Sequence, residues 1–273
     1  METERPYITE GQFGIRYLVH PESALDKHIV DSGMLPDWIA TRLGELIPPD
    51  SVVLDIGANA GLVTLPLARL AVPEGTVHAF EPDFQNASQL QTNVELNRLS
   101  NVVVVPAAVQ DDPSVETVTL HVRRAIDGDG KTNRGLSSLH RLSVHEVRDE
   151  HVLATTIDRY VNENDIGPVR FMKVDVEGAE LEVLRGGDAT IRRDLPIILY
   201  EYSSIIDGLG GGDGSLRSFS HLSSMGYRQY EIDREIRLIA LDEPRSEPMD
   251  SNVLCIHKSS PVRIPTDWFE AQE

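Results

Sequence analysis

The sequence predicts an α/β fold: a doubly wound, mostly parallel sheet with antiparallel C-terminal strands and a short N-terminal helical cap. Short apolar runs alternate with helical segments between residues 51 and 201, which is typical of parallel strands joined by crossover helices. A glycine-containing turn follows the first run. After residue 226, apolar runs follow one another with little helix between them, so we expect at least one antiparallel strand there.

The elements are assigned in chain order from hydrophobic spacing. Residues 35–47 place apolar side chains on one helical face, and Pro48 and Pro49 end this helix. Near-continuous apolar runs predict buried strands over residues 51–55, 76–81, 102–106, 171–175 and 197–201. Helices are predicted over residues 62–70, 83–96 and 179–184, and further extended segments over residues 115–122, 227–232, 236–241 and 253–257.

The chain is expected to form one domain over residues 1–273, with an N-terminal cap (1–49) and a catalytic core (50–273). Its 273 residues, 40% of them hydrophobic, suffice for one large α/β core. Residues 127–150 combine mixed charges, glycines and histidines without a clear period. We interpret them as an insertion over the C-terminal edge of the sheet, where such folds bind ligands, and expect a lid or wall there.

Charge and composition limit the partners. A formal net charge of −19 disfavours nucleic acid and anionic membranes. No apolar run is long enough to span a bilayer, and the first residues lack a signal-peptide pattern. Cys255 is the single cysteine, so an internal disulfide is excluded. Together these features predict a cytoplasmic protein with a small-molecule partner; oligomeric state stays open, a homodimer being one option.

The most informative segment joins the first strand to its helix. A carboxylate, Asp55, ends the strand, and Gly57 and Gly61 lie in the turn. A phosphate loop would need a lysine after Gly61, and a dinucleotide loop would need glycines where Asn59 and Leu62 stand. The remaining alternative is an S-adenosylmethionine loop. A carboxylate suits this cationic ligand better than a pyrophosphate.

The second strand carries another acid at its end. Glu81 lies where an acid accepts hydrogen bonds from ribose hydroxyls. It could instead favour the start of the next helix, ahead of Pro82. Because Asp55, Gly57 and Gly61 occupy the matching place one βα unit earlier, ribose binding is the preferred interpretation. Gly75, by contrast, is interpreted as an ordinary turn glycine.

Several motifs resemble the FkbM family of class I methyltransferases. They are VLDIGANAG at residues 53–61, AFEP at 79–82, MKVDVEGAE at 172–180 and VLRGG at 183–187. The runs GLSSL at 135–139 and LYE at 199–201 are similar to that family as well. The resemblance extends from about Ser51 to Glu201, and KVDVEGAE is its specific motif. It implies methyl transfer from S-adenosylmethionine, usually to a hydroxyl oxygen, in a family that often modifies natural products and sugars.

Acids at the later strand ends are candidates for the chemistry. An aliphatic hydroxyl is a weak acid, so its methylation needs a base or a metal. Asp175 and Glu201 each end an apolar strand, and Glu177 and Glu180 follow Asp175. These oxygens could remove the proton or bind Mg²⁺. Glu177 and Glu180 could also only stabilise a helix start, and Lys173 could be the ion-pair partner of Asp175.

The resulting assignments are as follows. The candidate cofactor contacts are Asp55, Gly57, Asn59, Gly61, Glu81, Pro82, Ala108 and Asp175. The candidate catalytic residues are Asp175, Glu177, Glu201 and His140, and the candidate metal ligands are Asp175 and Glu201. His145 and His151 are further possible bases, although each histidine could equally be an ordinary surface residue. A non-catalytic binding protein and a nicotinamide-dependent oxidoreductase remain as alternatives to the methyltransferase.

Overall fold

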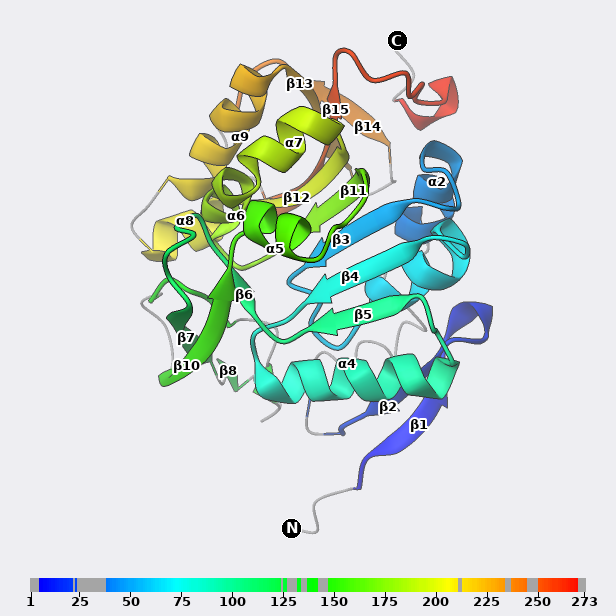
Figure 1. Ribbon diagram of the computed structural model, residues 1–273, viewed down its shortest axis with the longest axis vertical. Helices are drawn as coiled ribbons and strands as arrows, with labels where there is room; N and C mark the ends of the chain where they lie inside the picture. Colours follow the sequence, from blue (N-terminus) through cyan, green and yellow to red (C-terminus); the bar gives the residue numbers. More distant parts are fainter. Residues whose placement is uncertain are drawn as a thin grey trace.

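A large sheet forms the centre of the computed structural model (Figure 1). The structure describes residues 5–21, 23, 38–123, 125–126, 132–133, 137–141, 147–210, 213–233, 237–244 and 250–269. In this part of the chain the sheet has eight strands in the order β14-β13-β15-β12-β11-β3-β4-β5. Their bounds are β3 Val52–Ile56, β4 Thr76–Phe80, β5 Val102–Val105, β11 Val169–Val174, β12 Ile197–Ser203, β13 Tyr227–Ile232, β14 Leu238–Leu241 and β15 Asp250–His257.

The strand directions confirm the predicted fold class. Strands β5, β4, β3, β11 and β12 are parallel to their neighbours. Strand β15 pairs antiparallel with both β12 and β13, and β14 pairs antiparallel with β13. The chain builds outward from β3 to β5, then returns to β11 and builds in the opposite direction. Strands β3 and β11 therefore flank the switch point, where open α/β sheets bind ligands.

Helices cover both faces of the sheet (Figure 1). Their bounds are α2 Trp38–Leu46, α3 Thr64–Pro66, the π-helical η2 Leu67–Ala71, α4 Phe84–Asn97, α5 Ile157–Glu163, α6 Glu180–Gly186, α7 Asp188–Asp194, α8 Ser204–Gly210 and α9 Gly214–Met225. Alternate strand residues serve the two faces. Leu54 of β3 packs with Val183 of α6 and Leu222 of α9, whereas Val53 packs with Leu43 of α2 and Leu67 of η2.

No helix in the described ranges has both the length and the apolar character needed to cross a bilayer.

The N-terminal segment contains a β-hairpin that the sequence did not predict. Strands β1 (Tyr7–Glu10) and β2 (Arg16–Val19) pair antiparallel around a short turn, the 3-10 helix η1 (Gln12–Gly14). The hairpin buries Ile15 and Val19 against Leu90 of α4. Among the described residues of this segment, α2 corresponds to the expected helical cap. The cap is therefore strand as well as helix in its described part.

A second, smaller sheet stands beside the main one. Strand β7 (Thr117–Arg123) pairs antiparallel with β10 (Val147–Thr155), and the short β6 (Ala108–Val109) pairs parallel with β10. The extended segment predicted over residues 115–122 is thus confirmed by β7. Within the predicted insertion, 132–133 and 147–150 are strand residues, which the absence of a sequence period did not predict. Residues 127–131, 134–136 and 142–146 lie outside the described residues.

Candidate functional site

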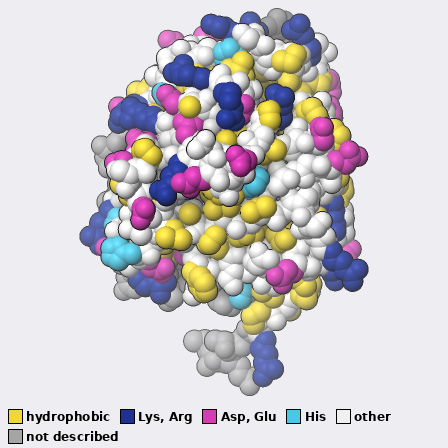
Figure 2. Space-filling view, in the orientation of Figure 1, with side chains coloured by type: hydrophobic (Ala, Val, Ile, Leu, Met, Phe, Trp, Pro, Cys, Tyr) yellow, Lys and Arg dark blue, Asp and Glu magenta, His cyan; other side chains and the backbone are white. Residues whose placement is uncertain are grey.

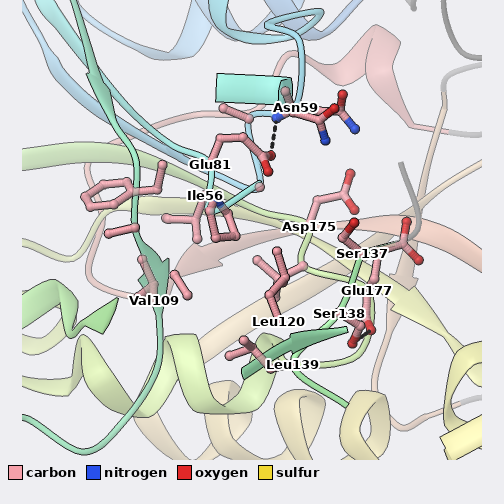
Figure 3. Close-up of a pocket in the computed structure, with 18 of the residues that line it drawn as sticks. Ile56, Asn59, Glu81, Val109, Leu120, Ser137, Ser138, Leu139, Asp175 and Glu177 are labelled. Carbon is pink, nitrogen blue, oxygen red and sulfur yellow. Dashed lines mark hydrogen bonds between the residues drawn. The ribbon is translucent and has the colours of Figure 1, made fainter. Parts of the chain in front are cut away.

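A cavity of about 290 Å³ opens at the carboxyl ends of β3, β4 and β11, beside the switch point (Figure 3). Its polar lining comes from the ends of these three strands and the loops after them, from the first turn of α4, and from residues 137–138 ahead of β10. Apolar side chains separate the polar groups. The polar lining residues are Asn59, Glu81, Asn86, Ser137, Ser138, Lys173, Asp175 and Glu177, and the apolar ones include Ile56, Leu62, Val63, Phe80, Pro82, Ala108, Val109, Leu120 and Leu139.

The loop after β3 needs its two glycines for close backbone packing. Gly57 has a φ of +85°, and a Cβ atom there would lie 1.7 Å from the Asp175 carbonyl oxygen. Gly61 has a φ of +91°, and its Cβ would lie 2.5 Å from the Leu90 Cδ1. Gly57 lines the cavity, whereas Gly61 lies away from it against α4. A side chain at Gly57 would therefore push the loop away from β11 as well as crowd a ligand.

The interpretation of Gly75 as an ordinary turn glycine is wrong. A Cβ atom at Gly75 would lie 2.0 Å from the carbonyl oxygen of Ser51. The backbone at the start of β3 leaves no room for a side chain there. Gly167 is a tolerant position, since a Cβ atom there meets no described atom within 4 Å.

Asp55 lies beneath the cavity and is not among its lining residues. Its side chain is fully buried, and Oδ2 accepts a 2.6 Å hydrogen bond from the Thr64 hydroxyl. Oδ1 has no hydrogen-bond partner among the residues that the structure describes. Burial raises the pKa of Asp55, and the charge of Lys173 acts against that rise. Direct contact between this carboxylate and a ligand therefore has no support in the geometry.

Glu81 occupies the place that the sequence analysis assigned to ribose recognition. Its Oε2 accepts a hydrogen bond of 2.8 Å from the Asn59 amide (Figure 3), and its Oε1 accepts one of 2.8 Å from the Asp83 amide. Burial raises the pKa of Glu81 to about 7, although these hydrogen bonds oppose the rise. The carboxylate thus joins the ends of β3 and β4 at the cavity wall.

The alternative role for Glu81, as the acid that starts the next helix, belongs instead to Asp83. Asp83 is the N-cap of α4, and its side chain accepts hydrogen bonds from the amides of Gln85 and Asn86. Such a cap satisfies amides that have no partner within the helix. Glu81 therefore does not cap the helix, and it lines the cavity.

Lys173, which is buried, and Asp175, which is partly exposed, form an ion pair at the end of β11. The Lys173 Nζ lies 2.8 Å from Asp175 Oδ2. Burial alone would lower the pKa of Lys173, but the carboxylates of Asp175 and Asp55 outweigh it and raise that pKa. The proposed ion-pair role of Lys173 is confirmed. Both side chains line the cavity as well.

Three carboxylates converge beside this pair. Asp175, Glu177 and Glu201 each place one oxygen within 4.8 Å of the others. Burial, reinforced by the charges of Asp175 and Glu177, raises the pKa of Glu201 to about 10. Glu201 therefore carries a proton at neutral pH. Asp175 and Glu177 line the cavity and Glu201 is not among the lining residues, but the structure brings together the three acids that were selected from the sequence.

Glu180 has the structural role that was kept open for it. Its Oε1 accepts hydrogen bonds of 3.1 Å from the amides of Val176 and Gly178. Burial raises its pKa to about 7. These bonds fix the turn in which Glu177 adopts a φ of 55°. Glu180 thus holds the turn that presents Glu177 to the cavity.

Residues 137–141 close the other side of the cavity. The Ser138 hydroxyl donates a 2.7 Å hydrogen bond to the Glu177 carbonyl oxygen and accepts one of 3.0 Å from the His140 amide. Ser137, Ser138 and Leu139 line the cavity beside Asp175 and Glu177 (Figure 3). In the sequence these three residues stood out only as part of a family resemblance. The hydroxyls of Ser137 and Ser138 gave no chemical signal on their own.

Of the candidate histidines that the structure describes, neither His140 nor His151 lines the cavity. His140 Nε2 lies 3.3 Å from Glu182 Oε1 at the surface, and this contact raises the pKa of His140. His151 lies on β10, outside the cavity lining, and His145 lies outside the described residues. The placement of His140 therefore does not support its predicted role as the base. Pro82 and Ala108, by contrast, line the apolar wall as expected for cofactor contacts.

Comparisons with known proteins agree with this arrangement. Residues 55–229 match the family model described as the methyltransferase FkbM domain. The chain is 30% identical over 150 residues to Methyltransferase 1 of Beauveria bassiana, covering 52% of this chain and 60% of that protein. It is 28% identical over 205 residues to the AMB antimetabolite synthetase AmbE of Pseudomonas aeruginosa, covering 64% of this chain and 9% of that protein.

A methyltransferase FkbM from Methylobacillus flagellatus has a similar structure, with a TM-score of 0.49 and 17% identity. The match covers 81% of this chain and 48% of that one. Because the score is modest, the fold assignment rests on the strand order described above. The chain spans less than two thirds of both curated relatives. The family match nevertheless extends over more than half of the sequence and includes all the strand ends that build the cavity, and the chain belongs to the FkbM family of methyltransferase domains.

Proposed function

We propose that this protein transfers a methyl group from S-adenosylmethionine to a hydroxyl oxygen of a small molecule. The observation that carries the proposal is the placement of Glu81 and Asp175 on either side of the loop 57–61, at the switch point of the sheet. In this arrangement one acid is available for a ribose. The other lies where the reactive end of the same ligand would reach.

The cavity lining suggests how the cofactor lies. The ribose hydroxyls donate hydrogen bonds to Glu81. The Asn59 and Asp83 amides and the Asn86 side chain already donate to this carboxylate, and a carboxylate offers about four lone pairs in all. The adenine packs against the apolar wall that includes Pro82 and Ala108. The amino-acid end extends over the loop that begins at Gly57, toward the acids of β11.

The reaction itself is an in-line displacement. An electron pair of the acceptor oxygen forms the new C–O bond as the C–S bond breaks, and the sulfonium becomes the thioether of S-adenosylhomocysteine. The hydroxyl proton must leave the acceptor in the same process. The protein can contribute alignment of the two reactants and a group that receives this proton.

The acids beside Ser137 are the proposed proton acceptors. Asp175 and Glu177 face the cavity, while Glu201 already holds a proton because its pKa is about 10. A negative cluster next to a sulfonium also attracts the cofactor. Asp175 is the best-positioned acceptor, and Lys173 keeps its carboxylate oriented at 2.8 Å.

Mg²⁺ would be an alternative means of activating the hydroxyl. Carboxylate oxygens suit this ion, but Mg–O bonds are about 2.0–2.1 Å long. Oxygens spread over as much as 4.8 Å would have to draw together to share one ion. The Lys173 ammonium also already compensates Asp175. We therefore propose base catalysis by the carboxylates, with the metal as the alternative that chelation tests.

The same charges restrict the acceptor. The lining includes one ammonium, that of Lys173, against the acids Glu81, Asp175 and Glu177 in the described part of the wall. An acceptor with a carboxylate or phosphate near its reacting hydroxyl would be repelled. On the face shown in Figure 2, acidic side chains lie among the basic ones, which offers little to a nucleic-acid backbone. We propose an uncharged or cationic hydroxyl compound as the acceptor.

The test is methyl transfer from labelled S-adenosylmethionine to a panel of hydroxyl compounds that differ in charge. We expect S-adenosylhomocysteine to form with uncharged or amine-bearing acceptors and not with carboxylated analogues of the same size. Preference for the carboxylated analogues would refute the proposed acceptor class. Failure to bind the cofactor at all would refute the function.

A further inference from the structure

Helix α4 carries a row of three buried amide side chains. Gln89, Asn93 and Asn97 are four residues apart and therefore lie on one face of the helix. A buried amide is unfavourable unless it is hydrogen-bonded. The row lies next to Leu90 and Val94, which pack against the N-terminal hairpin.

The amide row pairs with the free edge of β2, which runs alongside α4 in Figure 1. Asn97 accepts a 2.8 Å hydrogen bond from the Arg16 amide and donates one of 2.6 Å to the Arg16 carbonyl. Asn93 Oδ1 accepts a 2.7 Å bond from the Leu18 amide, and Gln89 donates one of 2.8 Å to the Leu18 carbonyl. The helix thus satisfies the strand edge as a neighbouring strand would.

Asn93 differs from Asn97 in its second hydrogen bond. Its Nδ2 donates to the carbonyl oxygen of Ala60 at 2.9 Å. Ala60 is buried in the loop after β3, directly after Asn59, whose amide donates to Glu81. One fully buried side chain therefore connects the hairpin to the loop that faces the cavity.

We propose that Asn93 is a positioning residue for the cofactor loop, and that through it the N-terminal hairpin controls cofactor affinity. The inference rests on the proposed function, in which residues 57–61 bind S-adenosylmethionine. No described residue of β1 or β2 lines the cavity. The hairpin acts on affinity by holding the loop, without touching the ligand.

The physical reason lies in the unusual backbone of the loop. Asn59 adopts a φ of 50°, which is uncommon for a residue with a side chain. Without the Asn93 donor, the buried Ala60 carbonyl loses a partner and the loop spends less time in this shape. The apparent affinity for a ligand then falls in proportion to the fraction of molecules whose loop has the binding conformation. Turnover at saturating cofactor stays the same, because Asn93 contacts none of the acids of the site.

The matched variants Asn93→Asp and Asn97→Asp test the proposal. Each keeps the acceptor for a β2 amide and loses the amide donor. The Asn97 amide donates to the carbonyl oxygens of Arg16 and Asn93, whereas the Asn93 amide donates to the loop at Ala60, so Asn93→Asp removes the direct bond to the loop and Asn97→Asp does not. We expect Asn93→Asp to weaken S-adenosylhomocysteine binding about tenfold. It should raise the KM for S-adenosylmethionine equally, with kcat unchanged. Asn97→Asp should keep the wild-type affinity despite a comparable loss of thermal stability. Equal affinity changes in the two variants, or none in Asn93→Asp, would overturn the proposal.

Hydrogen exchange in the wild-type protein provides a test that does not depend on folding of the variants. Because coupling between two sites is reciprocal, S-adenosylhomocysteine should slow exchange of the Leu18 amide, which bonds to Asn93. The Gly11 amide bonds to Ile15 within the hairpin and should be protected less. If the ligand binds but exchange of the Leu18 amide is not slowed, the role of Asn93 is refuted and the proposed function is not. Absence of ligand binding would refute the proposed function itself.

Discussion

The Lys173 ammonium lies 2.8 Å from Asp175 Oδ2. It also interacts electrostatically with the carboxylate of Asp55 on the neighbouring strand. Asp55 is paired with Lys173 across the β3–β11 register, and Asp175 follows two residues later, directly after the end of β11. One buried cation therefore compensates an acid beneath the cavity and an acid that lines it. Lys173 therefore stabilises the negative charge of both acids.

Removing the ammonium should destabilise the fold. We expect Lys173→Met to reduce the free energy of unfolding by about 3 kcal/mol. This value is at the lower end of the range for breaking a buried ion pair, because the Asp175 side chain is 34% exposed. Urea unfolding measures this loss. Adding Asp175→Asn to the variant should recover part of the stability, since one uncompensated charge disappears. Strictly additive losses would show that the two residues are not coupled.

Asp175→Asn alone should separate chemistry from binding. The amide keeps the shape of the side chain but cannot accept the acceptor proton. We expect turnover to fall at least about 100-fold while S-adenosylhomocysteine affinity changes little. Single-turnover kinetics with calorimetry on the same preparation measures both. Normal turnover in this variant would exclude Asp175 as the proton acceptor.

Chelation distinguishes the carboxylates from a metal. If the acids act directly, EDTA leaves the wild-type rate unchanged, and we expect this result. Loss of activity that Mg²⁺ restores would instead establish the metal-dependent route. The assay needs no variant, so folding does not complicate it.

The loop glycine should be intolerant of substitution. Gly57→Ala places a Cβ atom against the Asp175 carbonyl at a positive φ, and we expect a loss of about 3 kcal/mol in stability together with weakened cofactor binding. Gly167→Ala is the control, because its Cβ meets no neighbour. Thermal unfolding and calorimetry compare the two. Similar behaviour of both variants would contradict the packing described at Gly57.

The sequence predicted the parts of this site that depend on local pattern. The strand runs and the glycine turn gave β3, β4 and β11, and a parallel sheet necessarily brings their carboxyl ends together. Glu81, Asp175 and Glu201 could therefore be selected before any contact was known.

Features that depend on distant contacts were missed. The amide of Arg16 meets Asn97, 81 positions away, so nothing near the hairpin indicated where β2 would dock. Gly75 lies against the Ser51 backbone, a tertiary contact that a turn pattern cannot show. A strand-end acid such as Asp55 can point toward the ligand or beneath it, and only the structure decides.

Stability and cofactor affinity should depend on pH in opposite directions. Burial raises the pKa of Glu81 from 4.5 to about 7. Between these values the folded state holds a proton that the unfolded state has released, so Glu81 lowers the free energy of unfolding as pH rises. Ionised Glu81 is the better acceptor for ribose hydroxyls, so affinity should increase through about pH 7. Urea unfolding and calorimetry between about pH 5 and 8 should show both slopes reduced in Glu81→Gln; unchanged slopes would contradict this assignment.

The central claim is that Glu81 binds the ribose of S-adenosylmethionine in this cavity. Its most direct test is isothermal titration of S-adenosylhomocysteine into the wild type and Glu81→Ala, with NAD as a comparison ligand. We expect the wild type to bind S-adenosylhomocysteine but not NAD, and the variant to lose about 1–3 kcal/mol of binding free energy, because ribose hydroxyls lose their acceptor. Equal affinity of wild type and variant, or a preference for NAD, would contradict the assignment.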